Sequence, residues 1–332
     1  MSPIKLSICI INFNSGKLLS ACLLSILRYP PSCNYEVIVV DNASVDGSQL
    51  CASEYKNVRL IQNNKYVGFA AANNQAFDIS QGEYFLMLNA DTEVQLKALD
   101  ELISFAETHP RAGLISARLV NLDGSTQIGF NVRRLPNLSM AFVQLSLLDE
   151  IFPYNPITRS AGCMDLDYNQ PQLVEQPAAS AMIFRRVVWE KIGGLDTTFR
   201  IWYNDCDLCK RTRDAGWEVW YCPFARITHY GGRGSSSSAA KDVLIELYRS
   251  MRLYYLKHFG SIYYYIVSLL IIIGMSVRVM ILYVNPKLEK KINIHASKNN
   301  MLTQRSLFFA VFKDTLKSFV SLQKGICHIN VN

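Results

Sequence analysis

Short, almost uninterrupted apolar runs alternate with helix-like segments through the first 120 residues, and this alternation constrains the fold more than any other feature. The runs cover residues 6–11, 36–40, 58–61 and 84–88, and the segments 16–27 and 69–79 have helical patterns. A strand that is apolar at every position is buried on both faces, which is typical of a mainly parallel sheet covered by helices. Half of the 332 residues are hydrophobic and 18% are charged, which excludes a largely disordered chain.

Polar side chains follow the predicted strands at the point where each strand ends. They are Asn12 and Asn14, Asp41 and Asn42, Asn63 and Asn64, and Asn89 and Asp91. Open parallel sheets bind ligands at the carboxyl ends of their strands, so we expect a binding site at this edge. The proline-rich residues 121–177 predict loops and small strands, and another apolar strand follows at 181–184.

Two of these carboxylates allow both a structural and a functional interpretation. Asp91, with Asn89 two residues before it, could coordinate a hard divalent cation and the phosphates that the cation bridges. It could equally be the N-cap of a following helix. Asp41 could accept the imide N–H of a uracil or thymine base, or it could cap a helix near residue 46.

A second acidic cluster lies within residues 202–208, where Trp202 precedes Asp205 and Asp207. Aromatic residues followed by two acids predict a pocket wall beside a helix start. Two acids in a first turn are, however, more often caps, because they complement the helix dipole. Cys206 and Cys209 form a Cys-x-x-Cys in this stretch. We interpret the two cysteines as residues that pack within a helix, in preference to a zinc or redox site. The nine scattered cysteines form no legible disulfide framework, so we expect a reducing, cytoplasmic setting.

Seven motifs extend over residues 6–236, and their order and spacing make the set specific although each alone is weak. They are residues 7–15 (SICIINFNS), 39–48 (VVDNASVDGS), 68–74 (GFAAANN), 88–92 (LNADT), 205–211 (DCDLCKR), 215–217 (AGW) and 229–235 (HYGGRGS). The set resembles the family 2 glycosyltransferases of the GT-A fold, in their rhamnosyltransferase-like branch. The resemblance implies an α/β domain over residues 1–238, with a Rossmann-like, mainly parallel central sheet flanked by helices.

The resemblance also implies roles for individual residues. Asp41 would read the nucleotide base, and Asp91 would end the metal-binding Asp-x-Asp motif. His229 matches a histidine that completes the metal and diphosphate site, so Mg²⁺ or Mn²⁺ is the implied cofactor. Asp205 matches the general base of inverting members. The implied substrate-binding residues are Asn12, Asn14, Asp41, Asn42, Gly68, Asn74, Asn89 (in the first position of the Asp-x-Asp motif), Trp202, Asp207 and Arg233, whose guanidinium suits the diphosphate.

Three positions depart from the family pattern. Asn204 replaces the Glu that usually precedes the base, and Tyr66 replaces an Asn before the Gly-Phe motif. Ala179 lies in a stretch that usually carries a Gly beside the sugar or the acceptor. None of the three removes a catalytic group, but each could reshape specificity.

The basic charge is concentrated in the last quarter of the chain. Residues 1–240 hold 21 Lys and Arg against 23 Asp and Glu, whereas residues 241–332 hold 13 against 4. This distribution argues against the diffuse basic face of a nucleic-acid-binding protein, so we expect no nucleic-acid partner. It predicts instead a separate basic region, residues 239–332, with its own role.

A long apolar run in that region predicts association with a membrane surface. Residues 241–256 have amphipathic helical spacing, and residues 262–284 form a 23-residue apolar run in which Arg278 could snorkel. About 20 apolar residues span a bilayer, and a buried core helix is the alternative. We favour in-plane or hairpin insertion over a span, because a span would translocate the basic tail against the positive-inside rule. Residues 307–320 predict a membrane-surface helix.

Together these features predict an inverting, metal-dependent glycosyltransferase, peripheral or monotopic at the cytoplasmic face of the bacterial inner membrane. The resemblance implies transfer of L-rhamnose from dTDP-L-rhamnose to a lipid-linked (polyprenyl pyrophosphate) or polysaccharide acceptor, in O-antigen, capsule or cell-wall synthesis. The alternatives are a UDP- or GDP-hexose donor and a non-catalytic, nucleotide-sugar-binding scaffold protein. A dinucleotide-dependent oxidoreductase needs a Gly-x-Gly-x-x-Gly turn after the first strand, and residues 12–16 (NFNSG) are not one.

Overall fold

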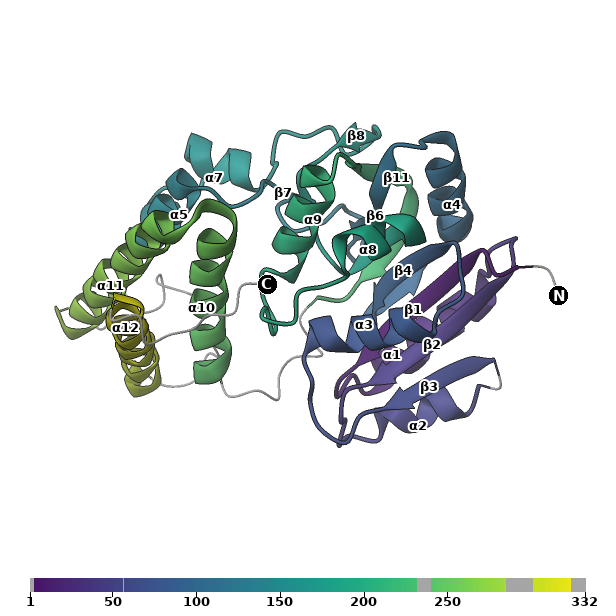
Figure 1. Cartoon of the computed structure of the whole chain (residues 1–332), viewed down its shortest axis with the longest axis horizontal. Coiled ribbons are helices and arrows are strands. Elements are labelled where there is room, and N and C mark those ends of the chain that lie inside the picture. Colours follow the sequence, from purple (N-terminus) through teal and green to yellow (C-terminus); the bar gives the residue numbers. More distant parts are fainter. Residues whose placement is uncertain (1–2, 56, 232–239, 285–300, 324–332) are drawn as a thin grey trace. The chain divides into compact units, whose positions relative to one another are not determined.

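The computed structural model describes residues 3–55, 57–231, 240–284 and 301–323. The described chain divides into two compact units (Figure 1), which we treat separately. The first contains Met1–Leu135, Gly162–Arg200 and Asn204–Ser237, and the second contains Pro136–Ala161, Ile201–Tyr203 and Ser238–Asn332. The second unit therefore includes residues 136–161 and 201–203, which the predicted region 239–332 leaves out.

The first unit is built on one mixed, mainly parallel sheet. Its described strands are β1 (Leu6–Asn12), β2 (Tyr35–Asp41), β3 (Val58–Gln62), β4 (Tyr84–Asn89), β5 (Thr92–Val94), β6 (Ala112–Val120), β8 (Gln172–Leu173), β10 (Ala181–Arg185) and β11 (Glu218–His229). They pair in the order β3-β2-β1-β4-β10-β6-β11-β5, with β8 beside β11. β3, β2, β1 and β4 are parallel, and β10 runs antiparallel between β4 and β6. A separate antiparallel pair joins β7 (Val132–Arg133) to β9 (Gln176–Pro177).

Helices bury both faces of this sheet, as the continuous apolar strands predict. Ile8 and Ile10 of β1 face a core shared with α1 (Lys17–Arg28), α2 (Ser48–Ser53) and α4 (Ala98–Thr108). Cys9, between them, faces the opposite core with α3 (Phe69–Ile79), α8 (Arg186–Ile192) and α9 (Asn204–Asp214). The alternation follows from the two-residue period of a strand. The predicted α/β fold is confirmed.

The predicted strands and helices of the first 90 residues match the structure to within one residue at most ends. The interpretation of Asp91 as a helix N-cap is wrong. Asp91 does not cap a helix, because the short strand β5 begins at Thr92 and the next helix, α4, begins at Ala98 with Lys97 as its N-cap. Asp91 therefore lies in the turn between β4 and β5, which leaves its carboxylate free of a capping role.

The second unit is helical in its described residues. Its helices are α5 (Leu138–Leu145), α6 (Leu148–Ile151), α7 (Pro156–Ala161), α10 (Ala240–Phe259), α11 (Ser261–Val284) and α12 (Met301–Gln323). α10, α11 and α12 pack on one another, and α11 also packs on α5. The helices predicted over 241–256, 262–284 and 307–320 are confirmed. α5, α6 and α7 lie where we predicted loops and small strands.

Arg278 of α11 is buried, so the expectation that it snorkels is wrong. Its guanidinium donates to the backbone carbonyl oxygens of Leu145 at 2.8 Å and Gln144 at 3.0 Å, at the end of α5. Glu150 Oε1 lies 3.5 Å from the same guanidinium. A cation is favourable at a helix C-terminus, where carbonyl groups lack partners within the helix. Arg278 therefore ties α11 to α5 inside the unit.

The other face of α11 presents a row of exposed apolar side chains, which we call the α11 stripe. The stripe consists of Ile262, Ile266, Leu269, Ile273, Val277, Met280 and Val284. Its members recur every three or four residues, whereas Val267, Ile271 and Met275 are buried. Among the described helices, α11 is the one whose length and composition would allow it to cross a membrane.

Candidate active site

The polar residues at the ends of β1, β2 and β4 meet at one edge of the sheet, as predicted. Asn12 and Asp41 are register partners, and Ile11 is paired with Asn89 on the other side of β1. The buried Asn12 amide donates to Asp41 Oδ1 at 2.7 Å and to Ser48 Oγ at 2.8 Å. Asn12 Oδ1 is buried without a hydrogen-bond partner in the described part of the chain.

The side chains around Asp41 hold the loops that follow the strands. Asp41 Oδ2 accepts a hydrogen bond from the backbone N–H of Ser44 at 3.0 Å, and Asn14 Oδ1 accepts one from Val45 at 2.8 Å. Asp41 is not a helix cap, because α2 begins at Ser48 after Gly47. Its predicted contact with a nucleotide base stays a prediction.

Asn42 and Gly68 connect the loop that follows β2 to the start of helix α3. Asn42 Oδ1 accepts from the backbone N–H of Val67 at 2.8 Å, and its amide donates to the Gly68 carbonyl at 3.2 Å. Gly68 has a φ of 92°, and a Cβ there would lie 3.2 Å from the backbone oxygen of Arg200. Glycine is therefore needed at this position, on which the turn into α3 depends.

Asp91 and His229 come together, although 138 positions separate them in the sequence. β11 pairs with β5 so that His229 lies opposite Thr92, and this brings His229 Nε2 to 3.6 Å from Asp91 Oδ1. Ser180 Oγ lies 3.2 Å from the same nitrogen, and it accepts a hydrogen bond from the Asn89 amide at 3.2 Å. The sequence motifs did not predict Ser180 as a partner of this group.

The surroundings of His229 favour its neutral form. Burial lowers the pKa of the imidazole below its usual value, and the nearby Asp91 carboxylate opposes this shift only in part. The Asp91–His229 contact is therefore not an ion pair at neutral pH. A neutral imidazole can offer a nitrogen lone pair to a metal ion, which a protonated one cannot.

Asp91 and His229 fit a divalent cation whose other ligands come from a bound substrate. A carboxylate oxygen and an imidazole nitrogen are suitable donors for Mn²⁺, and a carboxylate is suitable for Mg²⁺. No group of three or more His, Cys, Asp or Glu side chains that could hold a metal occurs among the described residues. Such an ion would thus take few ligands from the protein, as is usual where substrate phosphates supply the others.

Asp205 lies in the first turn of α9, and two side chains donate hydrogen bonds to one of its carboxylate oxygens. Arg133 Nη2 donates to Asp205 Oδ2 at 3.0 Å, and Gln176 Nε2 donates to the same oxygen at 2.7 Å. Arg133 and Gln176 are register partners in the β7–β9 pair. Asp205 Oδ1 accepts from the backbone N–H of Cys206 at 2.9 Å. Neither Arg133 nor Gln176 carries a sequence signal that could have identified it.

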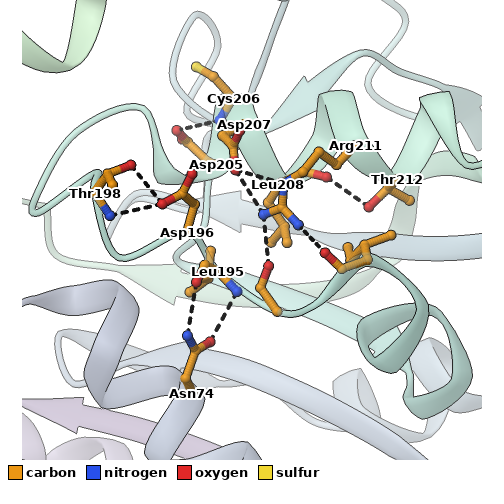
Figure 2. Close-up of polar contacts among 12 residues, drawn as sticks. Asn74, Leu195, Asp196, Thr198, Asp205, Cys206, Asp207, Leu208, Arg211 and Thr212 are labelled. Carbon is orange, nitrogen blue, oxygen red and sulfur yellow. Dashed lines mark hydrogen bonds and ion pairs between the residues drawn. The ribbon is translucent and has the colours of Figure 1, made fainter. Parts of the chain in front are cut away.

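Two predicted substrate ligands, Asn74 and Asp207, have structural partners (Figure 2). The Asn74 amide donates to the Leu195 carbonyl at 2.8 Å, and its oxygen accepts from the Leu195 N–H at 3.0 Å. Asp207 is fully buried and accepts from Arg211 at 2.8 Å. This geometry favours a role in holding the chain before α9, and we do not propose either residue as a ligand.

The other predicted residues of this region have different surroundings. Trp202 belongs to the second unit and is 43% exposed. Arg233 lies outside the described residues. Asn204 is buried, and both polar atoms of its amide lack a hydrogen-bond partner in the described ranges. Burial raises the pKa of the Cys206 and Cys209 thiols well above its usual value, which fits helix packing.

Comparisons with known proteins concern the family and the fold of the chain. Residues 7–165 match the family model described as Glycosyl transferase family 2. The N-acetylglucosaminyl-diphospho-decaprenol L-rhamnosyltransferase of Mycobacterium tuberculosis is 27% identical over 225 residues, which cover 62% of this chain and 70% of that protein. Rhamnosyltransferase WbbL of Escherichia coli K12 is 26% identical over 216 residues, which cover 63% of this chain and 77% of WbbL.

The fold is also similar to a solved structure. The crystal structure of S. aureus TarS 1-349 in complex with UDP-GlcNAc superposes with a TM-score of 0.52 at 15% identity, covering 97% of this chain and 84% of that crystallised chain. At that identity the likeness concerns the fold, which is of the GT-A type. The motifs and the fold agree with the family model, and residues 7–165 of the chain belong to glycosyl transferase family 2.

Proposed function

We propose that the protein transfers L-rhamnose from dTDP-L-rhamnose to a polyprenyl-diphosphate-linked glycan, with inversion at the anomeric carbon. The proximity of Asp91 and His229, 3.6 Å apart, carries this proposal, because the two side chains would together bind a cation that holds a diphosphate. Two relatives, of M. tuberculosis and E. coli, are named rhamnosyltransferases, and the first acts on a diphospho-decaprenol. Both names support the choice of sugar, and the first also supports the choice of acceptor.

On the donor side, Asp91 and His229 would hold Mg²⁺ or Mn²⁺. When bound, the ion neutralises the charge that grows on the leaving nucleoside diphosphate. Asp91 contributes a carboxylate oxygen and His229 contributes the Nε2 lone pair of its neutral ring. Asn12, Asn14, Asp41, Asn42 and Gly68 shape the loops in which we place the nucleoside. Asp41 remains our candidate for reading the base.

On the acceptor side, Asp205 would act as the general base. Its carboxylate takes the proton of the acceptor hydroxyl as that oxygen attacks C1 of the sugar from the face opposite the diphosphate. The new C1–O bond forms while the bond from C1 to the phosphate oxygen breaks, and one such displacement inverts the centre. Arg133 and Gln176 keep the carboxylate in position through Oδ2. The unpartnered Asn204 amide would suit a sugar hydroxyl, which both donates and accepts.

We also infer that the second unit places the enzyme on a membrane, at the cytoplasmic face of the bacterial inner membrane. The α11 stripe is exposed and apolar along the whole helix, whereas the face with Arg278 packs on α5 within the unit. An in-plane position would bury the stripe in lipid and keep the Arg278 contacts intact. This placement suits an acceptor that carries a polyprenyl chain.

The test of the proposed donor is thermal stabilisation of the purified full chain by dTDP-, UDP- and GDP-sugars, with and without Mn²⁺. We expect dTDP-L-rhamnose to raise the Tm most, in a metal-dependent way that Asp91→Asn abolishes. A larger Tm increase with a UDP- or GDP-hexose would identify that sugar nucleotide as the donor in place of dTDP-L-rhamnose. Binding without turnover of any sugar nucleotide on a lipid-linked acceptor would point to the non-catalytic scaffold.

A further inference from the structure

Gln127, in the segment between β6 and β7, contacts both the ring and the backbone of His229. Its amide nitrogen donates to the His229 carbonyl oxygen at 2.8 Å and to Asn121 Oδ1 at 3.0 Å. Its amide oxygen lies 2.9 Å from His229 Nδ1. The side chain therefore makes three contacts, two of them to one residue.

These contacts determine which ring nitrogen carries the proton. A backbone carbonyl oxygen can only accept, so the Gln127 atom that faces the His229 carbonyl must be the amide nitrogen. The amide oxygen then faces His229 Nδ1, and an oxygen cannot donate there. Nδ1 must therefore be the protonated nitrogen. The usual ambiguity between the two ends of a glutamine amide does not arise here.

The opposite nitrogen, Nε2, is left with its lone pair. It faces Asp91 Oδ1 at 3.6 Å and Ser180 Oγ at 3.2 Å. Phe130 stacks on the imidazole, with ring centroids 5.1 Å apart and planes 12° apart, which restricts rotation of the ring. The neutral ring thus has one orientation and one tautomer, with its lone pair directed to the side where Asp91 lies.

We propose that Gln127 is a positioning residue that holds His229 as the Nδ1–H tautomer, so that Nε2 is ready to bind a divalent cation together with Asp91. This inference rests on the proposed metal site. A histidine ligand needs a partner on its other nitrogen to fix the tautomer, and loss of such a partner typically weakens metal binding 10- to 100-fold. The same partner is expected to act before any metal arrives.

The test reads the tautomer in the full chain without divalent metal. Long-range ¹H–¹⁵N correlation spectra of ¹⁵N-histidine-labelled protein at neutral pH distinguish Nδ1–H from Nε2–H, and H229Q identifies the His229 signals. We expect Nδ1–H in the wild type. Gln127→Leu should shift His229 toward Nε2–H and raise the Kd for Mn²⁺, measured by electron paramagnetic resonance, roughly 10- to 100-fold.

Two further variants keep the test decisive. Gln95→Leu removes a glutamine that bonds Thr228, the neighbour of His229 on β11, and should leave both tautomer and Kd unchanged. Gln127→Glu keeps an oxygen beside Nδ1 and should keep the Nδ1–H form. The proposal is overturned if the wild type is Nε2–H, or if Gln127→Leu retains the Nδ1–H form. Because the tautomer is read without sugar or acceptor, failure of the transfer reaction would count against the proposed function alone.

Discussion

Asp205 and Asp207 lie two residues apart in the first turn of α9, and their surroundings separate their roles. Asp205 is partly exposed and held through one oxygen by Arg133 and Gln176. Asp207 is fully buried against Arg211, which in turn donates to two backbone carbonyl oxygens. The sequence alone does not distinguish the roles of Asp205 and Asp207. Only the burial of each carboxylate distinguishes a group that can meet a substrate from one that supports the fold.

The role of Arg133 can be tested against its neighbour. Arg133→Gln should lower kcat about 10- to 100-fold with little change in donor KM, because it frees the Asp205 carboxylate without touching the donor site. Arg134 pairs with Glu175 at 2.8 Å instead, so Arg134→Gln is the matched control. Steady-state kinetics of transfer measure both. Equal kcat values in the two variants would show that Arg133 does not position the Asp205 carboxylate.

The structural role of Asp207 predicts a loss of stability. Asp207→Asn breaks a buried ion pair and should lower the free energy of unfolding by about 3 kcal/mol. Asp214→Asn, on the same helix, breaks the more exposed pair with Lys210 and should change it by about 0.5 kcal/mol or less. Chemical denaturation measures both. If the Asp207→Asn protein is as stable as the wild type but binds the donor more weakly, Asp207 is a substrate ligand and not a structural residue.

At the scale of elements, the sequence predicts β1 to β4 well because each is a continuous apolar run. It misses β11, which contains Pro223 and changes register twice along β6. The β7–β9 pair consists of two-residue strands whose register alone brings Arg133 and Gln176 to Asp205. Such strand pairings depend on tertiary structure, and no local sequence pattern predicts them. The motifs thus indicate candidate site residues such as Asp205, but they do not indicate the residues that support them.

The packing of α11 on α5 gives a prediction at this scale. A Cβ at Gly274 would lie 2.4 Å from the Leu145 carbonyl oxygen, which also accepts from Arg278. Gly274→Ala should therefore lower the free energy of unfolding by about 1–3 kcal/mol, although the same change in an open helix stabilises it. Ser276→Ala, exposed on the same helix, is the control. A higher Tm for Gly274→Ala would contradict the close approach of α11 to α5.

At the scale of the whole molecule, the charge and the apolar surface are divided between different parts of the chain. The first 240 residues carry nearly balanced charge, and the last 92 carry the basic excess. The α11 stripe belongs to the second unit, and the candidate catalytic carboxylates belong to the first. We therefore expect membrane binding and donor binding to be separable by mutation.

Membrane binding should depend on the α11 stripe. The combined change Leu269→Gln, Ile273→Gln and Met280→Gln should weaken co-sedimentation with vesicles of phosphatidylglycerol and phosphatidylethanolamine about 100-fold or more, because three apolar side chains no longer enter lipid. Leu24→Gln, Leu27→Gln and Leu50→Gln alter equally exposed leucines of the first unit and serve as the control. Unchanged co-sedimentation of the stripe variant would exclude the stripe as the lipid-binding surface.

We propose that Asp205 removes the proton from the acceptor hydroxyl during sugar transfer. The most direct measurement compares Asp205→Asn with the wild type in single-turnover transfer from dTDP-L-rhamnose to a polyprenyl-diphosphate-linked acceptor, together with the Kd for dTDP. We predict a loss of transfer rate of about 10²- to 10⁴-fold at an unchanged Kd. Transfer at the wild-type rate by Asp205→Asn would exclude Asp205 as the general base.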